Sequence, residues 1–415
     1  MPVTSTETPP QAPSADPPER RGLAARVRLG AVFAPVSSEF LLIASTALLL
    51  TGFGLVMILS ATSATATAAG QQPYDAVLKQ AVFAVIGIPL MFIASRLPLS
   101  FWKKAAWPGL IAASALQLLV LTPLGVENDG NRNWISIGGL QAQPAEFLKL
   151  ALALWLGTVL FRKQALLGKW RHALIPALPV TILVIGTDLA GGDLGTAMIL
   201  FVVALAGLFF SGVKLRILLV PLTLSAAAVG FLALNSSNRM ARIMSFLNPD
   251  TTACYYNECY QSLHGIWGLA GGGILGLGLG NSKEKYDWLP AAANDYIFAI
   301  IGEELGLVGC LVVLALFTIF AIGAFHIVRR SNDMFVRVVA GAIGVWVIGQ
   351  ALLNIGVVLR LFPVLGVPLP FVSQGGTSLI SVLLASGVLL SFARNLPPKP
   401  AARRTAAPDD ADPIA

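Results

Sequence analysis

The sequence predicts an all-α polytopic membrane protein with about ten transmembrane helices, and three observations support this prediction. Only 12% of the 415 residues are charged and 56% are hydrophobic, whereas a soluble domain carries roughly a quarter charged residues. Apolar runs of about 20 residues recur along the chain, long enough to cross a hydrocarbon core of ~30 Å. Basic residues gather in alternate short segments between these runs.

The apolar runs define the expected elements in chain order. The spans are expected at residues 39–61, 77–96, 105–124, 144–161, 172–188, 193–212, 216–235, 299–327, 335–359 and 375–393. Residues 39–394 then form the membrane domain, with a large extracytoplasmic loop, 236–298, between the seventh and eighth spans. The flanking segments 1–38 and 395–415 are rich in Pro and Ala, and we expect both to be disordered tails.

The basic residues predict which side each segment faces. An even number of spans places both termini on one side of the membrane, and the positive-inside rule makes that side cytoplasmic. The net charge of +7 therefore reports topology, and no nucleic-acid partner is expected. The basic clusters between spans are Arg96, Lys103 and Lys104; Arg162, Lys163, Lys169 and Arg171; Lys214 and Arg216; and Arg329, Arg330 and Arg337.

Two cysteines lie close together in the long outer loop. Cys254 and Cys259 bound the segment CYYNEC, where an oxidising compartment would permit a disulfide. Two free thiols are the alternative. A metal site is not indicated, because the pair has no neighbouring third Cys or His ligand.

A glycine-rich stretch, Gly268–Gly280, follows in the same loop. A phosphate-binding loop is excluded by its context, since there is no preceding strand and no G-K-[ST]. Two interpretations remain: tight packing of backbone against a helix or a re-entrant turn, or a flexible floor beneath a lipid-linked ligand.

The segment NDYIFAIIGEELG places three acids in an apolar run. On an uninterrupted helix Glu303 would lie about 80° round from Asp295, and Glu304 about 180°. Glu303 and Glu304 open the eighth span, where the helix dipole favours carboxylates. Asp295 lies at the membrane edge, and low dielectric there would raise its proton affinity, as suits a general base. We therefore take Asp295 as the catalytic candidate, with Glu303 as a supporting, substrate-binding residue.

A second polar group opens the fourth span, in GNRNWISIGGLQAQPAEFLKL. Arg132 lies in the loop, and Glu146 and Lys149 are three residues apart at the start of the span. Such a pair can be a structural ion pair on the helix or can handle a ligand. Both interpretations stay open from the residues alone.

Three further polar residues stand at the outer ends of spans. Asp193 in GGDLGTA has the position of a helix N-cap. Arg239 and Arg242 in NRMARIMSFLNPD could contact lipid head groups or bind a substrate diphosphate.

Four segments together resemble the SEDS family (shape, elongation, division and sporulation). They are QPAEFLKL, GGDLGTA, GLGLGNSKEKYDWLPAAANDYIFAIIGEELGLVG and LPFVSQGGTSL, in that order along nearly all the spans. Within the family the chain most resembles the FtsW branch of actinobacteria, and the RodA branch is the alternative. One departure is that Gly191 and Gly192 stand where Gln and Pro are usual.

The resemblance implies a peptidoglycan glycosyltransferase in the cytoplasmic membrane, polymerising lipid II at the outer face during septal wall synthesis. It also implies a growing glycan strand as product, a class B penicillin-binding protein as partner, and other division proteins. The essential outer-loop acid of the family maps onto Asp295. Its loop arginine and its Glu and Lys map onto Arg132, Glu146 and Lys149.

A mechanism follows as a hypothesis. Asp295 would deprotonate the acceptor sugar hydroxyl, and Arg132, Lys149, Arg239 and Arg242 would offset the charge of the departing diphosphate. No cofactor is certain, although a divalent cation (Mg or Mn) would suit that diphosphate, and no metal ligands are identified. The rivals are a lipid II flippase and a scaffold. Charged residues gather at the outer edge rather than the midplane, which favours chemistry over transport.

Overall fold

The structure is a computed structural model that describes residues 37–68, 70–128, 131–137, 140–234, 240, 243–244, 246–247, 255 and 259–397. The chain divides into two units, Met1–Val36 and Ser37–Ala415, and the description below concerns the second. Most of both predicted tails lies outside the described residues, so their disorder stays a prediction. Arg239, Arg242 and Cys254 also lie outside them.

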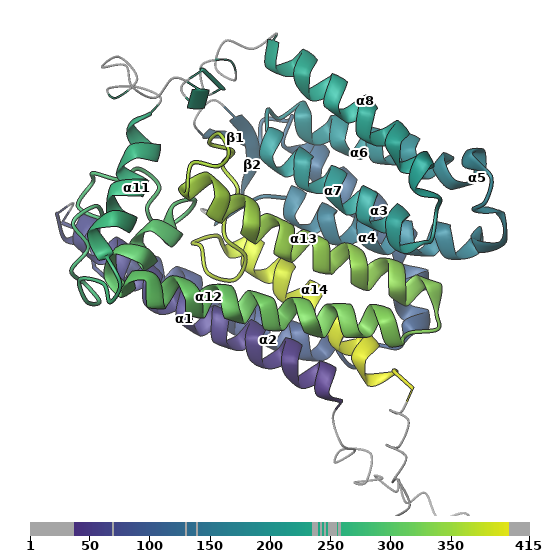
Figure 1. Cartoon of the computed structure of the whole chain (residues 1–415), viewed down its shortest axis with the longest axis horizontal. Coiled ribbons are helices and arrows are strands. Elements are labelled where there is room, and N and C mark those ends of the chain that lie inside the picture. The colour runs from purple at the N-terminus through teal and green to yellow at the C-terminus, as the bar shows by residue number, and fades with distance from the viewer. Residues whose placement is uncertain are drawn as a thin grey trace, which may run out of the picture. The chain divides into compact units, whose positions relative to one another are not determined.

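The described chain is mainly helical (Figure 1). Every expected span coincides with a helix, although the fifth is shorter than expected and follows a separate turn of helix. The helices are α1 (Ser38–Ala68), α2 (Asp75–Ala94), α3 (Leu99–Leu119), α4 (Ala145–Arg162), α5 (Trp170–Leu174), α6 (Ala177–Leu189), α7 (Leu194–Phe210), α8 (Leu215–Leu234), α11 (Tyr260–Gly272), α12 (Ile297–Arg330), α13 (Met334–Val358) and α14 (Gly376–Arg394).

Six helical segments among the described residues are long and apolar enough to cross a membrane. They are α1, α2, α12, α13, α14 and Trp170–Leu189, which joins α5 to α6. Helix α7 is apolar but shorter, and α4 carries three charged residues, Glu146, Lys149 and Arg162. The chain is therefore a multi-pass helical membrane protein.

A small antiparallel sheet interrupts the helical pattern between α3 and α4. Its strands, in the order β1-β2-β3, are β1 (Gly125–Asn128), β2 (Asn131–Ile137) and β3 (Leu140–Ala142). Asn133 and Ile135 of β2 are buried, whereas Arg132, Trp134 and Ser136 are half-buried, which is the period of two expected of a strand. The prediction of an all-α chain is therefore wrong for β1, β2 and β3, where this alternation within a polar loop favours strands.

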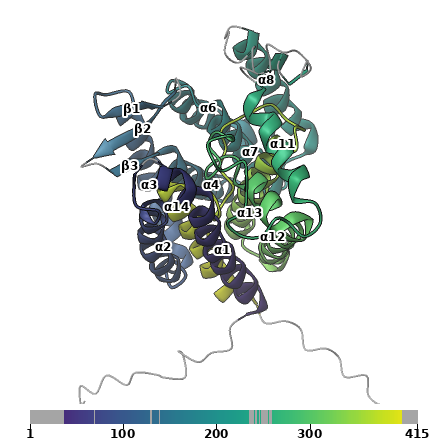
Figure 2. The ribbon, with the colours of Figure 1, turned by 90° about the vertical axis from the view of Figure 1, so that its left-hand side faces the viewer.

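Helix α4 lies at the centre of the bundle, and nearly every residue from Ala145 to Leu160 is buried. It packs against α3, α7, α13 and α14, as expected for a helix that is apolar all round. Glycines allow close approach: a Cβ on Gly157 would lie 2.4 Å from Val339, and one on Gly341 would lie 2.1 Å from Phe210. Small residues at such contacts are typical of helix packing in membranes. Figure 2 shows the sheet and α11 on opposite sides of this bundle.

Candidate active site

Asp295 lies in a turn that immediately precedes α12. Residues 291–296 form turns and the helix begins at Ile297, so no helical angle relates Asp295 to Glu303. The angular prediction is therefore wrong, because its premise of an uninterrupted helix does not hold. The turn is tied to the segment before α14: the Ser373 hydroxyl donates to the Asn294 carbonyl at 2.6 Å, and the Gln374 N–H donates to the Ala293 carbonyl at 2.9 Å.

A single buried side chain fixes the backbone of Asp295 itself. The Asn354 side-chain amide of α13, 2% exposed, donates to the Asp295 carbonyl at 2.7 Å and to the Val367 carbonyl at 2.8 Å. Asp295 is half-buried. A Cβ added at Gly366, which has a φ of +67°, would lie 3.7 Å from its Oδ2. The acid is therefore held against the loop between α13 and α14 with its side chain partly open to solvent.

A column of buried polar groups continues from Asn354 towards α4. One turn along α13, Gln350 donates to the Pro368 carbonyl at 2.8 Å and accepts from Lys149 Nζ at 3.0 Å. Lys149 pairs with Glu146 at 2.8 Å, and Glu146 accepts from the Ser381 hydroxyl at 3.1 Å. Each group thus has a partner, as buried charges require. The column joins α4, α13 and α14 to the loop that carries Gly366.

The ion pair predicted for Glu146 and Lys149 is confirmed. Both side chains are 2% exposed and lie within the bundle rather than on an outer surface. Lys149 also lies 5.0 Å from the centre of the Trp346 ring. Their predicted contact with substrate stays a prediction, and the geometry favours action through Gln350 on the loop beside Asp295.

Asp193 caps α7, as predicted. Its Oδ1 accepts from the Thr196 N–H at 2.8 Å. Its Oδ2 accepts from Asn133 of β2 at 2.8 Å and from Gln143 at 2.9 Å. The cap therefore also fastens the sheet and the start of α4 to α7.

Arg132 of β2 is held by the segments that follow two helices, α3 and α6. Its Nη2 donates to the Thr122 carbonyl at 2.6 Å, and its backbone N–H donates to the Gly191 carbonyl at 2.7 Å. The side chain is half-buried. Arg132 is thus positioned by elements other than those that fix Asp295, and its predicted role in substrate binding stays a prediction.

Helix α12 is kinked at Gly306, whose φ of 66° and ψ of −164° are not helical. A straight helix would use the Glu303 and Glu304 carbonyls as acceptors for residues four positions on. At the kink they accept instead from the N–H groups of Leu277 and Gly278, at 3.0 and 2.9 Å. The preceding loop therefore replaces the missing donors.

The same exchange occurs in the opposite direction. The N–H groups of Leu307 and Val308, which lose their helical acceptors at the kink, donate to the carbonyls of Gly273 and Ile274 at 3.0 and 3.2 Å. Segment 273–278 is thus inserted into the hydrogen-bond ladder of α12. Of the two interpretations of the glycine-rich stretch, tight backbone packing is confirmed.

The side chains of Glu303 and Glu304 strengthen this junction. Both carboxylates are almost fully buried. Glu303 accepts from the Lys283 N–H at 2.8 Å, and Glu304 accepts from the Ser60 hydroxyl of α1 and from Lys285 Nζ, the latter at 3.1 Å. Both acids therefore organise the loop that precedes α12, while the predicted contact of Glu303 with substrate stays a prediction.

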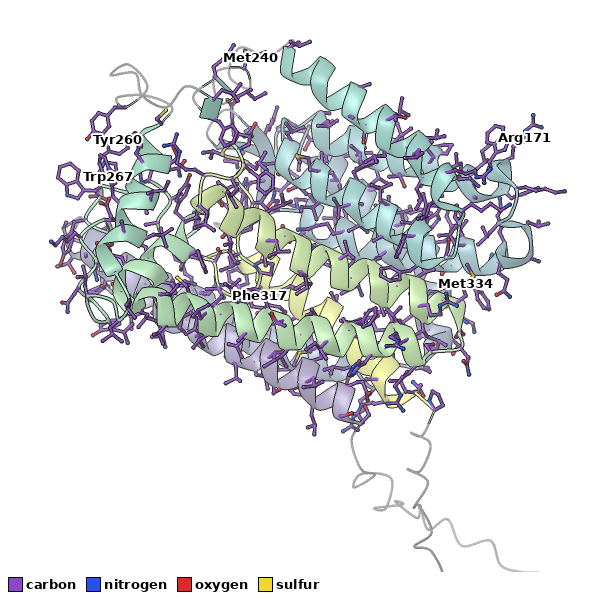
Figure 3. The ribbon with its side chains drawn as sticks, in the orientation of Figure 1. Arg171, Met240, Tyr260, Trp267, Phe317 and Met334 are labelled. Atoms are coloured by element: carbon purple, nitrogen blue, oxygen red, sulfur yellow. The ribbon has the colours of Figure 1, made fainter. Side chains whose placement is uncertain are left out.

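An aromatic cluster fastens α11 to the segment before Asp295. His264 Nδ1 lies 2.6 Å from Glu284 Oε2, and the His264 ring is 4.3 Å from Tyr260 and 4.8 Å from Trp267, centre to centre. Desolvation and nearby negative charge, including that of Glu284, raise the pKa of Tyr260. Figure 3 labels Tyr260 and Trp267 on α11. This cluster helps to give the long loop a defined structure.

The predicted disulfide is partly within the described residues. Cys259 is buried at the start of α11 and is disulfide-bonded, whereas Cys254 lies outside them, so the pairing of the two stays a prediction. Arg239 and Arg242 cannot be placed for the same reason. Within the described ranges no three His, Cys, Asp or Glu side chains converge as a metal site would require.

Comparison with known families decides the relationship of this chain. The model of the FtsW/RodA/SpoVE family, described as cell cycle protein, matches residues 40–397.

The chain belongs to the FtsW/RodA/SpoVE family.

Similar members of the family come from several bacteria. "Probable peptidoglycan glycosyltransferase FtsW" of Mycobacterium tuberculosis is 35% identical over 92% of this chain and 73% of the relative. The protein of the same name in Geobacter metallireducens is 34% identical over 86% and 95%, respectively. "Stage V sporulation protein E" of Bacillus subtilis is 33% identical over 86% and 97%.

Two solved structures share the fold. One comes from a study of the coordination of polymerization and crosslinking by a peptidoglycan synthase complex, with a TM-score of 0.69, 25% identity and coverage of 85% of this chain and 96% of the other. The second is an aspartate-to-alanine mutant of the rod shape determining protein RodA of Thermus thermophilus. Its TM-score is 0.63, with 25% identity over 86% and 98% of the two chains.

The departure from the usual family pattern at Gly191 and Gly192 has a structural explanation. A Cβ on Gly191 would lie 2.4 Å from the Arg132 carbonyl, and one on Gly192 would lie 2.7 Å from the Asn131 side chain. Gly192 also has a φ of +90°. In this family member the turn between α6 and α7 therefore accepts β2 in direct backbone contact.

Sequence reasoning missed Asn354 and Gln350, the two side chains that join the column to the loop. A signal was present, because both are polar residues within an apolar span, VWVIGQALLNIG. Such residues usually face a partner inside the bundle. Their spacing of four residues places them on one helix face.

Proposed function

We propose that this family member is a peptidoglycan glycosyltransferase that polymerises lipid II at the outer face of the cytoplasmic membrane, as an FtsW-like enzyme of septal wall synthesis. The observation that carries the proposal is the position of Asp295, a half-buried acid on a turn that Asn354 holds through the Asp295 carbonyl and Ser373 holds through the Asn294 carbonyl. A positioned carboxylate beside a glycine loop suits a general base. The names of the relatives agree with this activity.

In the proposed reaction Asp295 accepts the proton of the acceptor sugar 4-hydroxyl. The oxygen then forms a bond to the anomeric carbon of the lipid-linked donor strand. The bond from that carbon to the undecaprenyl diphosphate breaks with inversion, and the diphosphate leaves with the bonding electrons. Because diphosphate is a good leaving group, one carboxylate base is sufficient.

The remaining polar residues have two proposed tasks. Arg132, Arg239 and Arg242 offset the charge of the departing diphosphate, since guanidinium groups bind phosphate in bidentate fashion. Glu146 and Lys149 hold the loop beside Asp295 through Gln350. A divalent cation stays a prediction, and no step above is routed through one.

The proposed topology places ten spans in the membrane with both termini in the cytoplasm. The long loop between α8 and α12 then faces outward and carries Asp295. A class B penicillin-binding protein is the proposed partner, because the similar complex combines polymerization with crosslinking. A RodA-like elongation role is the alternative within the same chemistry.

The test compares two carboxylates of the same outer loop in purified protein supplied with lipid II and the partner. Asp295→Asn should lower the rate of glycan-strand formation by about 10²–10⁴-fold, the usual contribution of one positioned base. Asp287 is the matched control: it is exposed and has a φ of 63°, a conformation that Asn tolerates well. Asp287→Asn should polymerise like the wild type.

Two results would contradict the proposal. One is an Asp295→Asn protein that forms strands at the wild-type rate. The other is a wild-type protein that moves labelled lipid II across vesicles but forms no strands, which is the behaviour of a flippase.

A further inference from the structure

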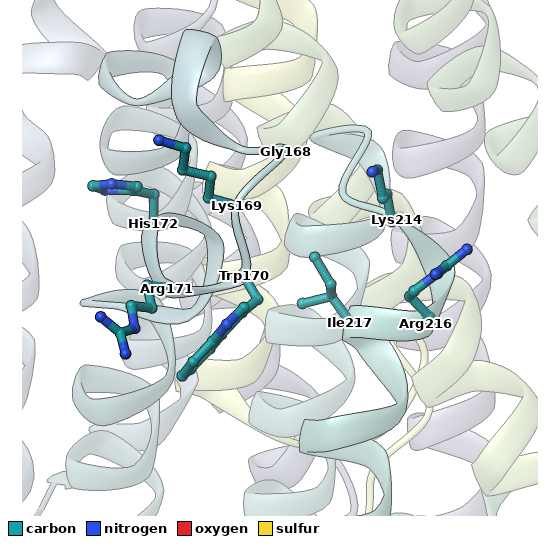
Figure 4. A pocket seen from close by; sticks show the side chains of 8 residues that line it. All are labelled: Gly168, Lys169, Trp170, Arg171, His172, Lys214, Arg216 and Ile217. Atoms are coloured by element: carbon teal, nitrogen blue, oxygen red, sulfur yellow. The ribbon is translucent and has the colours of Figure 1, made fainter.

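A basic cavity of about 550 Å³ lies far from the candidate active site (Figure 4). It is formed by the segment between α4 and α6, by the turn between α7 and α8, and by the first turn of α8. The polar residues and the tryptophan that line it are Lys169, Trp170, Arg171, His172, Lys214 and Arg216. The cavity and Glu146 lie at opposite ends of α4, whose 18 residues span about 27 Å at ~1.5 Å per residue. The cavity therefore belongs to the opposite end of the bundle.

The charge of this cavity is uncompensated within the described part of the chain. No acidic residue lines it, and none of the described ion pairs involves Lys169, Arg171, Lys214 or Arg216. Helix α8 has no acidic residue in its first turn but begins beside two cations. A helix N-terminus favours negative charge, so this arrangement is the reverse of the usual one. An anion placed here would satisfy both the side chains and the helix dipole.

Large apolar side chains are exposed beside the cations. Trp170 is 57% exposed and Leu215 is 67% exposed, while Ile217 also lines the cavity and is 8% exposed. Arg171 lies 5.4 Å from the centre of the Trp170 ring. Tryptophan is enriched where the bilayer meets water. The expected ligand thus has an anionic head and apolar chains, rather than being a small soluble anion.

We propose that this cavity binds the phosphate of an anionic phospholipid from the cytoplasmic leaflet. The proposal rests on the cytoplasmic placement of this end, which the positive-inside rule supports. It does not depend on the proposed catalysis. Basic pockets between transmembrane helices on this side are suited to anionic head groups. Lys169 and Arg171 line the cavity from one segment, and Lys214 and Arg216 line it from the other.

The test measures lipid retained by the full-length purified chain, by native mass spectrometry with added phosphatidylglycerol or phosphatidylcholine. The wild type should retain phosphatidylglycerol in preference to phosphatidylcholine. Lys169→Gln combined with Lys214→Gln removes one charge from each side. It should weaken retention about 30-fold, from roughly fivefold per charge. The matched control, Lys104→Gln with Arg337→Gln, removes two exposed cations from other basic segments and should bind like the wild type.

Each remaining outcome overturns the proposal. Equal retention of the two lipids would show no preference for an anionic head. If the pocket variant and the control variant lost phosphatidylglycerol retention to the same extent, the lipid would be held by general charge attraction rather than by a site. Displacement of the lipid by inorganic phosphate at equal concentration would assign the site to a soluble anion. The single variant Arg216→Gln, together with the phosphate competition on the wild type, keeps the test decisive if the double variant does not fold.

Discussion

Replacing Asn354 by Leu tests whether the buried column positions the catalytic candidate. Leu has the same branched outline as Asn, although it is bulkier, and it donates no hydrogen bond. The Asp295 and Val367 carbonyls would lose donors at 2.7 and 2.8 Å. A buried polar group left without its partner costs about 1–3 kcal/mol. The substitution therefore removes about 2–6 kcal/mol of stabilisation, and it does so at the turn that carries the acid.

Even a small displacement of Asp295 is expected to have a large effect on catalysis. A displacement of about 1 Å in a reacting group can lower the rate by ~10²-fold, so we expect kcat for lipid II polymerisation to fall by that order. The KM should change little, because Asn354 is buried away from the outer surface. Both constants are measured on purified protein with its partner, beside the thermal unfolding temperature of each variant.

The control is Asn395→Leu. Asn395 donates one hydrogen bond of the same kind, 2.8 Å to the Ser391 carbonyl, at the far end of α14. It should leave kcat unchanged. The reasoning is refuted if Asn354→Leu keeps the wild-type kcat, or if its kcat falls no more than that of the control.

Two further predictions concern the junction between α12 and the loop that precedes it. Gly306→Ala places a Cβ 2.4 Å from the Gly276 nitrogen at a φ of +66°, so strain of about 1–3 kcal/mol and overpacking of about 1–3 kcal/mol should lower the unfolding temperature. Gly52→Ala, with open space around it, is the control, and equal unfolding temperatures would contradict the packing. Lys285→Met should destabilise by about 3–5 kcal/mol, because the Glu304 carboxylate stays buried without its cation. Adding Glu304→Gln should recover much of that loss of stability, measured by thermal unfolding. A double variant that is less stable than Lys285→Met alone would argue against the Lys285–Glu304 ion pair.

Much of the helical architecture could be predicted from the sequence, because apolar runs flanked by polar segments leave little choice in a membrane. The sheet was missed, because its strands are short and occur in a polar loop where glycines also favour turns. Asp295 and the Glu146–Lys149 pair were found by the rarity of charge among apolar residues.

The arrangement of the site could not be predicted in the same way. Whether Asp295 begins a helix or lies in a turn depends on Ser373 and Asn354, which are distant in the sequence. The burial of Glu303 depends likewise on a backbone segment some 20 residues earlier. Periodicity reports only local structure, so contacts of this range need the fold.

The loop segment inserted at Gly306 also bears on how the protein is made. Without residues 273–278 the backbone N–H and carbonyl groups of α12 at the kink would lack hydrogen-bond partners, and lipid hydrocarbon cannot provide such partners. Residues 273–278 precede α12 in the chain, so they are synthesised before the helix. The hydrogen-bond partners of the kink are therefore already present in the chain when α12 is made. A rearranged chain that carried residues 273–278 after α12 would have the helix made before its partners.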